Sequence, residues 1–214
     1  MLRLFIAIEF PREILHQFRQ IQADLRRLTI GGRFPPADNL HLTLQFLGDT
    51  PQEQVPRLIA SLAAAAGQSL PFALTLGEPG VFGETNPYRV VWLGVKGELT
   101  ALRQLRAAVA RATASLGFAG ERAMYRPHIT LARAVNFSVR DRQGPPWRRQ
   151  ASGPSFMVRD FALLDSSLCD GKRTYRRLAG FALAGDMCGQ KKENRRSDGN
   201  IANKNSRAGA EQER

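Results

Sequence analysis

The apolar positions in the first part of the chain follow two different periods. Residues 3–8 form a short apolar run typical of a strand, residues 11–28 repeat apolar side chains at helical spacing, and residues 40–47 return to a strand pattern. The apolar face of the predicted helix consists of Ile14, Phe18, Ile21 and Leu25. Pro11 suits the first helical position, where a backbone N–H is not needed. This part of the chain predicts a strand-helix-strand unit.

The same order of elements appears a second time. Residues 88–95 predict a strand, residues 98–116 a helix, and residues 125–132 a further strand. The inward face of this helix consists of Leu102, Leu105, Val109 and Leu116. Gly117 is predicted to end the helix. The interval from Arg3 to His41 is 38 residues and that from Tyr88 to His128 is 40, which indicates an internal duplication.

The remaining segments add a helix and several strands. Thr50 and Glu53 have the spacing of a capping box for a helix that runs to about residue 66, and residues 72–76 alternate as a strand. Two more strands are predicted near residues 156–164 and 174–184. We expect an α+β fold: a bilobal, pseudo-twofold arrangement of two antiparallel-rich sheets with outer helices around a central cleft.

One domain is predicted for residues 1–187, with duplicated units at about 1–80 and 88–187 whose lobes exchange strands. Residues 188–214 are rich in Lys, Arg, Asn and Gly and contain one large aliphatic side chain. Such a segment cannot bury enough apolar surface to offset its chain entropy, so a disordered basic tail is predicted.

Charge and cysteine content limit the kinds of partner and site that the chain can have. The formal net charge is +12, and because residues 187–214 carry seven basic and four acidic side chains, the folded part keeps +9. An excess of this size favours an anionic partner such as nucleic acid. Two cysteines, Cys169 and Cys188, can form neither a disulfide framework nor a zinc site.

The start of the chain has a five-residue apolar run that ends at Glu9, which is too short for a signal peptide. No stretch of about 18 apolar residues occurs. A cytoplasmic protein without a membrane span is predicted.

Two of the three histidines open a His-x-Thr-Leu strand. Residues two apart in a strand share a face. His41 and Thr43, followed by Gln45, should therefore lie on one face of the first motif strand. Leu42, Leu44 and Phe46 should lie on the other. In the second motif strand, His128 and Thr130 should share a face, with Ile129 and Leu131 opposite.

Paired lobes would bring both motifs to one cleft, where an in-line displacement at phosphorus needs one proton acceptor and one donor. Histidine can serve as either near neutral pH. Thr43 and Thr130 can donate hydrogen bonds to phosphate oxygens. The competing interpretation is a metal site, but two histidines without a third ligand are fewer than such sites use, so no metal is predicted.

Basic and aromatic neighbours extend the candidate site. Arg126 lies two residues before His128, on the same face of a regular strand, whereas Arg133 reaches that face only if the strand bends near Ala132. Either guanidinium could bind phosphate or remain solvated. Phe5 could stack on a base or pack in the core. A loop with arginines around a tryptophan is a surface loop that could also contact RNA. Its residues are Arg140, Arg142, Trp147, Arg148 and Arg149.

Three segments carry a family resemblance: RLFIAI from Arg3, HLTLQFLG from His41, and RPHITLAR from Arg126. Over about residues 1–185 the chain resembles the bacterial RNA 2′,3′-cyclic phosphodiesterases, also named 2′-5′ RNA ligases, of the two-histidine phosphoesterase superfamily. The resemblance implies a bilobal α+β fold that requires neither metal nor ATP, and a reaction that opens a 2′,3′-cyclic phosphate to a 2′-phosphomonoester.

The resemblance also implies roles for individual residues. His41 would be the proton donor to the departing 3′-oxygen and His128 the acceptor that activates water. Thr43, Thr130 and Arg133 would bind the phosphate. The reverse reaction would join a 5′-hydroxyl RNA to a cyclic phosphate through a 2′-5′ bond.

Two other functions remain open at this point. One is a phosphodiesterase for a small cyclic nucleotide or ADP-ribose cyclic phosphate, and the other is a non-catalytic module that binds RNA ends or nucleotides. A binding module needs hydrogen-bond donors but no matched acid and base, so the histidine pair favours the enzyme. A monomer is predicted because the duplication already supplies both motifs.

Overall fold

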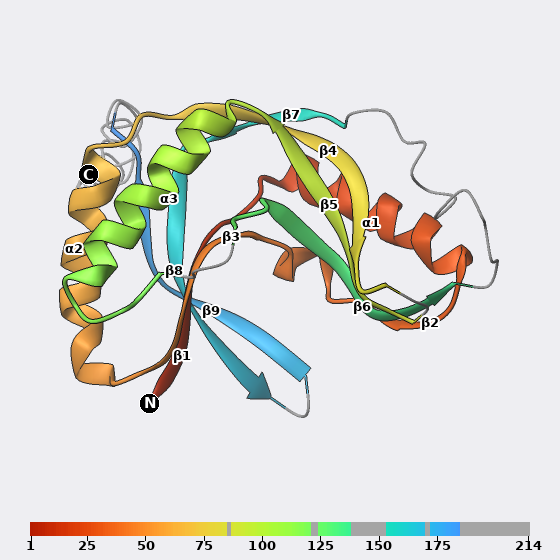
Figure 1. The fold of residues 1–214 in the computed structure, drawn as a ribbon, viewed down its shortest axis with the longest axis horizontal. Helices are drawn as coiled ribbons and strands as arrows, with labels where there is room; N and C mark the ends of the chain where they lie inside the picture. Colours follow the sequence, from red (N-terminus) through yellow and green to blue (C-terminus); the bar gives the residue numbers. More distant parts are fainter. Residues whose placement is uncertain (85–86, 121–123, 138–152, 170–171, 185–214) are drawn as a thin grey trace, which may run out of the picture.

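A computed structural model describes residues 1–84, 87–120, 124–137, 153–169 and 172–184. Its strands form a nine-stranded sheet (Figure 1). They are β1 (Leu2–Ile8), β2 (Thr29–Arg33), β3 (Leu42–Thr50), β4 (Phe72–Phe82), β5 (Tyr88–Gly97), β6 (His128–Phe137), β7 (Ser155–Val158), β8 (Asp160–Cys169) and β9 (Lys172–Ala182). The helices are α1 (Arg12–Arg27), α2 (Val55–Gly67) and α3 (Leu99–Ala114), with short 3₁₀ turns η1 (Ala37–Asn39) and η2 (Gln52–Gln54).

The strand order is β7-β4-β5-β6-β3-β1-β8-β9, with β2 paired to β6, and every described pairing is antiparallel. We call β3, β1, β8 and β9 the β1 half, and the remaining strands the β5 half. The halves meet at the centre, where β3 and β6 share the pair Leu42 and Ile129. The α+β class is confirmed, and the two expected sheets are joined into one at this pair.

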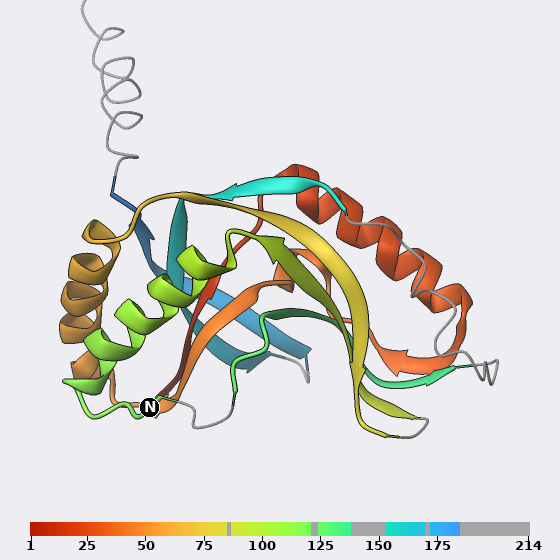
Figure 2. The same cartoon turned by 45° about the horizontal axis from the view of Figure 1, so that its top comes forward.

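The helices cover one face of the sheet, and their apolar sides build the core. Helices α2 and α3 pack against each other over the β1 half, while α1 lies along the β5 half (Figures 1 and 2). Gln22 of α1 donates its side-chain amide to the Leu131 carbonyl of β6 at 2.9 Å. Phe18 of α1 and Leu102 of α3 are fully buried in the same hydrophobic cluster. One core therefore serves both halves.

Each half takes elements from both predicted units. Helix α1 and strand β4, from the first unit, join the β5 half. Helix α3 and strands β8 and β9, from the second unit, join the β1 half. The strand exchange between duplicated units and the boundaries of those units both stay predictions.

Some element ends differ from the prediction. The capping box is wrong because Thr50 still belongs to β3, where its hydroxyl donates to the Gly48 carbonyl at 3.1 Å. Helix α2 begins only after η2, and its N-cap Gln54 makes no side-chain capping bond. Strand β6 begins at His128, three residues later than expected, and β2 was not predicted.

Strand β4 continues six residues beyond its predicted end. A bulge between Leu76 and Pro79 carries the strand past Gly77. The terminal tail, the arginine-tryptophan loop and Cys188 lie outside the described residues. None of the helices in the described segments is both long and apolar enough to span a bilayer.

Candidate active site

The two motif histidines lie at the start of the two central strands. His128 opens β6 and His41 directly precedes β3. Leu42 and Ile129 are paired, and because the strands are antiparallel, continuing that register sets His41 towards Thr130 and Thr43 towards His128. The motif aliphatic residues Leu42, Leu44, Ile129 and Leu131 are all buried in the core, at 0–1% exposure. The opposite face, which we call the histidine face, carries the polar motif residues.

Each histidine ring is held by the same local contact. His41 Nδ1 lies 2.8 Å from the carbonyl oxygen of Asn39, and His128 Nδ1 lies 2.8 Å from that of Arg126. A carbonyl oxygen can only accept, so Nδ1 carries the proton in both rings. Nε2 is then the nitrogen that can exchange a proton with a substrate.

Aromatic rings flank each histidine. The His41 ring centroid lies 4.8 Å from that of Phe5 and 5.2 Å from that of Tyr175. The His128 ring lies 5.0 Å from Phe82 and 6.3 Å from Trp92. These rings restrict both imidazoles on their flanks, so the orientation of Nε2 is determined by packing as well as by the Nδ1 bond.

A β-bulge turns Arg133 onto the histidine face. Thr130 pairs with Trp92, whereas Ala132 pairs with Val91, so Leu131 is an extra residue in β6. The alternation is shifted by one position, and Arg133, opposite Val90, shares the face of Thr130. This bulge is the bend that the sequence required for Arg133 to reach the site.

Bulges in β3 also shift the alternation of side chains, and they contradict the predicted faces of Gln45 and Phe46. Thr43 pairs with Ala7 and Phe46 with Phe5, so Phe46, not Gln45, shares the histidine face. Gln45 points to the other side, where its side-chain oxygen accepts a hydrogen bond from the Thr113 hydroxyl at 3.0 Å. The predicted faces of Gln45 and Phe46 are therefore wrong, since strict alternation does not hold across a bulge.

Two other predicted contributors have different surroundings from those expected. Arg126 is exposed and precedes β6, so a regular strand does not place its side chain on the face of His128. Its contact with the site is the backbone carbonyl that holds His128. Phe5 is only 2% exposed and packs against His41. Its ring supports the histidine and has no free face for a base.

Electrostatics distinguish the histidine on β3. Burial lowers the pKa of His41, the nearby charges of Arg133 and His128 lower it further, and the Asn39 hydrogen bond raises it in part. Burial raises the pKa of Tyr175, while Arg133 and Arg173 oppose that shift. Arg133 on β6 therefore lies close enough to influence His41 and Tyr175, which both belong to the β1 half.

The aromatic residues beside the histidines were not predicted from the sequence: Phe82, Trp92 and Tyr175. Trp92 lies in a correctly predicted strand, and the pairing of the two motif strands with their neighbours would have placed it beside Thr130. Phe82 required the unpredicted extension of β4. Within the described segments, no three His, Cys, Asp or Glu side chains lie together as potential metal ligands.

Known proteins resemble this chain over most of its length. The family model of LigT-like phosphoesterases matches residues 8–92, which include the first motif. An RNA 2′,3′-cyclic phosphodiesterase of Escherichia coli (strain K12) is 34% identical over 189 residues, covering 85% of this chain and 96% of that protein. The chain belongs to the LigT-like phosphoesterase family.

Two further known proteins show how much of this LigT-like phosphoesterase is covered by the similarity. The crystal structure of E. coli LigT complexed with 3′-AMP matches with a TM-score of 0.68 at 31% identity, covering 85% of this chain and 98% of that one. An RNA 2′,3′-cyclic phosphodiesterase of Geobacillus stearothermophilus is 38% identical over 129 residues, 60% of this chain. That match spans 41% of the Geobacillus protein.

Proposed function

We propose that the chain hydrolyses the 2′,3′-cyclic phosphate at the end of an RNA to a 2′-phosphomonoester, without a metal, using His41 and His128 as a general acid and base. The observation that carries this proposal is the matched pair of imidazoles. Each ring is fixed through Nδ1 to a carbonyl two residues earlier, which leaves Nε2 for proton transfer. The names of the E. coli and Geobacillus relatives support the substrate class.

The reaction needs both histidines in different protonation states. His128 Nε2 takes a proton from water as the water oxygen bonds to phosphorus, and the bond from phosphorus to the 3′-oxygen breaks. His41 Nε2 gives its proton to that 3′-oxygen. The products are a 2′-phosphate and a 3′-hydroxyl, and exchange with solvent restores the starting protonation.

If His41 is the proton donor, its imidazole must be protonated when the substrate is bound. In the free protein, burial and the charge of Arg133 favour neutral His41, which cannot donate from Nε2. A bound cyclic phosphate brings a negative charge to the same face, and this charge opposes the effect of Arg133. Substrate binding therefore raises the pKa of His41 and populates the donor form in the complex.

The phosphate is bound by neutral and charged donors from both motifs. The Thr43 and Thr130 hydroxyls donate to its non-bridging oxygens, and Arg133 neutralises the charge that develops on them. The bulge in β6 supports this role for Arg133. The same groups would serve the reverse reaction, in which a 5′-hydroxyl RNA replaces water and a 2′-5′ bond forms. The chain supplies both motifs, so a monomer suffices.

The test is turnover of an oligonucleotide that ends in a 2′,3′-cyclic phosphate, in EDTA, with His41→Ala and His128→Ala as comparisons. We expect the wild-type protein to yield 2′-phosphate ends and both variants to be nearly inactive. Near wild-type turnover by either variant would contradict the acid-base pair. Dependence of the wild-type activity on a divalent metal would contradict the metal-free mechanism.

The same assay separates the alternatives. Tight binding of an unchanged oligonucleotide would identify a binding module. Turnover of a mononucleoside 2′,3′-cyclic phosphate, with none of the oligonucleotide, would identify an enzyme for small cyclic nucleotides. Either result would overturn the proposed activity on RNA.

A further inference from the structure

Helix α3 and the segment before β6 bind the backbone of the first motif strand. Tyr125 donates its hydroxyl to the Thr43 carbonyl at 2.9 Å, and Arg106 of α3 donates Nε to the Leu44 carbonyl at 3.2 Å. The Arg106 guanidinium also lies over the Tyr125 ring, 4.3 Å from its centroid. We call Tyr125 and Arg106 the β3 clamp. We propose that the β3 clamp positions the two motif histidines relative to each other for the two proton transfers.

Strand β3 accepts these side-chain bonds where its ladder with β1 is interrupted. Thr43 lies opposite Ala7, and Gln45 lies opposite the adjacent residue of β1. Leu44 between them has no partner in β1, so it is the extra residue of a β-bulge. A bulge leaves backbone groups outside the regular ladder, and they need other hydrogen-bond partners.

The ladder with β6 ends at the same place. Among the described residues, Leu42 and Ile129 are the pair that joins β3 to β6. Continuing that antiparallel register sets Pro127 towards Leu44, and proline has no backbone N–H to donate. The β3 clamp supplies donors where neither neighbouring strand continues its pairing. Its two side chains therefore hold β3 against the start of β6.

Tyr125 also connects the first motif to the ring of His128. Its hydroxyl binds the carbonyl of Thr43, a residue of the first motif. The residue after Tyr125 is Arg126, whose carbonyl holds His128 Nδ1 at 2.8 Å. A displacement of Tyr125 relative to β3 therefore moves His128 relative to His41. Proton transfer to and from the two sides of one phosphorus depends on the alignment of both rings.

Helix α3 anchors the clamp in the core. Thr113, about two turns after Arg106, donates its hydroxyl to the Gln45 side-chain oxygen at 3.0 Å, and Thr113 and Gln45 are both buried. Leu102 and Val109 of the same helix are fully buried. Arg106 thus projects from a helix that is fixed by packing and by a second bond to β3, which is what a positioning contact requires.

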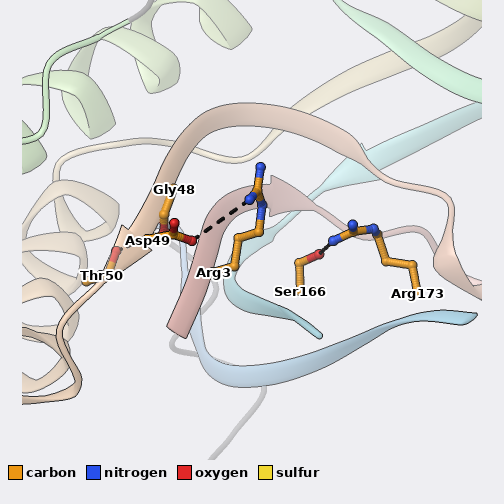
Figure 3. A network of polar contacts seen from close by, with 6 residues as sticks. All are labelled: Arg3, Gly48, Asp49, Thr50, Ser166 and Arg173. Atoms are coloured by element: carbon orange, nitrogen blue, oxygen red, sulfur yellow. Dashed lines mark hydrogen bonds and ion pairs between the residues drawn. The ribbon is translucent and has the colours of Figure 1, made fainter. Parts of the chain in front are cut away.

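This inference rests on the proposed function, and its test compares two hydroxyl bonds to carbonyls of β3. Tyr125→Phe removes the hydroxyl that binds Thr43 and keeps the ring beside Arg106. Thr50→Val is the matched control, because it removes a buried hydroxyl that donates to the Gly48 carbonyl at 3.1 Å, at the far end of β3 (Figure 3). The values of kcat and KM are measured on a mononucleoside 2′,3′-cyclic phosphate, together with the melting temperature of each variant.

The two variants should differ in catalysis and resemble each other in stability. Tyr125→Phe should lower kcat about ten-fold with a smaller change in KM, because the substrate still binds while the proton carriers are misaligned. Thr50→Val should lower the melting temperature by a similar amount and keep the wild-type kcat. Arg106→Met should lower kcat in the same direction by less. Arg106→Lys, which keeps a cation and a donor, should retain most of the activity.

NMR signals of the histidine rings test the positioning without turnover. The chain has three histidines, and His16 on α1 is exposed and serves as an internal reference. Tyr125→Phe should shift the ring-proton signals of His41 and His128, since each ring lies about 5 Å from an aromatic neighbour whose effect depends on distance. Thr50→Val should leave the signals of all three histidines unchanged.

The outcomes separate the clamp from the proposed function. If the wild-type protein hydrolyses the cyclic phosphate and Tyr125→Phe keeps its kcat and its ring signals, the clamp is wrong and the proposed function stands. Equal losses of kcat in Tyr125→Phe and Thr50→Val would also overturn the clamp, because stability alone would explain them. If the wild-type protein is inactive, the proposed function fails, and the ring signals alone decide whether the clamp positions the histidines.

Discussion

The two halves of the sheet hold a histidine in the same way and differ five residues later. Both rings are bonded through Nδ1 to a carbonyl two residues earlier, at 2.8 Å. After a bulge in each strand, however, the β1 half presents Phe46 on the histidine face and the β5 half presents Arg133. The likeness suits a reaction that needs two proton carriers. The difference places an aromatic ring on one side and a cation that could bind phosphate on the other.

Removal of either histidine should abolish the acid-base catalysis to which both halves contribute. His41→Ala and His128→Ala should each lower kcat for a cyclic phosphate by about 10²- to 10⁴-fold, because each removes one proton transfer. The measurement is steady-state turnover of a mononucleoside 2′,3′-cyclic phosphate. A loss confined to one variant would mean that only one half performs acid-base chemistry.

Removal of Arg133 should break the charged side of the comparison. Arg133→Ala should lower kcat/KM by about 10²-fold, since a cation beside the developing phosphate charge is lost. Arg126→Ala is the matched comparison, because it keeps the carbonyl that holds His128, and we expect it to lose far less activity. An equal loss in both variants would restore the phosphate-binding role that the sequence suggested for Arg126.

Substitution of the two threonines tests whether both motifs contribute a hydroxyl that binds the phosphate. Thr43→Val and Thr130→Val keep the side-chain shape and remove one hydroxyl donor each. Every lost hydrogen bond to a charged phosphate should lower kcat/KM roughly ten-fold. Kinetics of the two single variants provide the check, and Thr→Ser at each position should retain most activity. Full activity in either valine variant would remove that hydroxyl from the site.

Asn39 gives the His41 side a support of its own. Its side-chain amide donates to the Arg173 carbonyl at 3.2 Å, and its own carbonyl holds the His41 ring. Asn39→Ala should reduce kcat about two- to five-fold and change the pH profile, since His41 loses part of its orientation. An unchanged pH profile together with lowered thermal stability would mean that Asn39 serves only the fold.

The smallest expected effect concerns the titration of His41. Burial first, and then the charge of Arg133, lower its pKa in the free protein. Arg133→Gln removes that positive charge, so the protonated form of His41 becomes easier to form and its pKa should rise. An NMR titration of the ring protons in both proteins measures the change. An unchanged pKa would mean that the charge of Arg133 lies too far from His41 to act on it.

The sequence predicts the parts of the site that depend on local patterns. His41, Thr43, His128 and Thr130 follow from alternation within one short strand each, and the buried Leu42 confirms the face. Arg133 and Phe46 lie beyond bulges, which depend on how neighbouring strands register. The contact between His41 and Tyr175 joins residues far apart in the chain. Packing over such distances is settled by the tertiary structure, so local periodicity does not reveal it.

The most direct test of the central claim changes the leaving group. A 2′,3′-cyclic phosphate with sulfur in place of the 3′-bridging oxygen departs as a thiolate and hardly needs a proton donor. We predict that His41→Ala regains at least about a hundred-fold relative to the oxygen substrate, whereas His128→Ala stays inactive. Rescue of His128→Ala alone would reverse the two roles. Equal losses on both substrates in both variants would contradict acid-base catalysis by this pair.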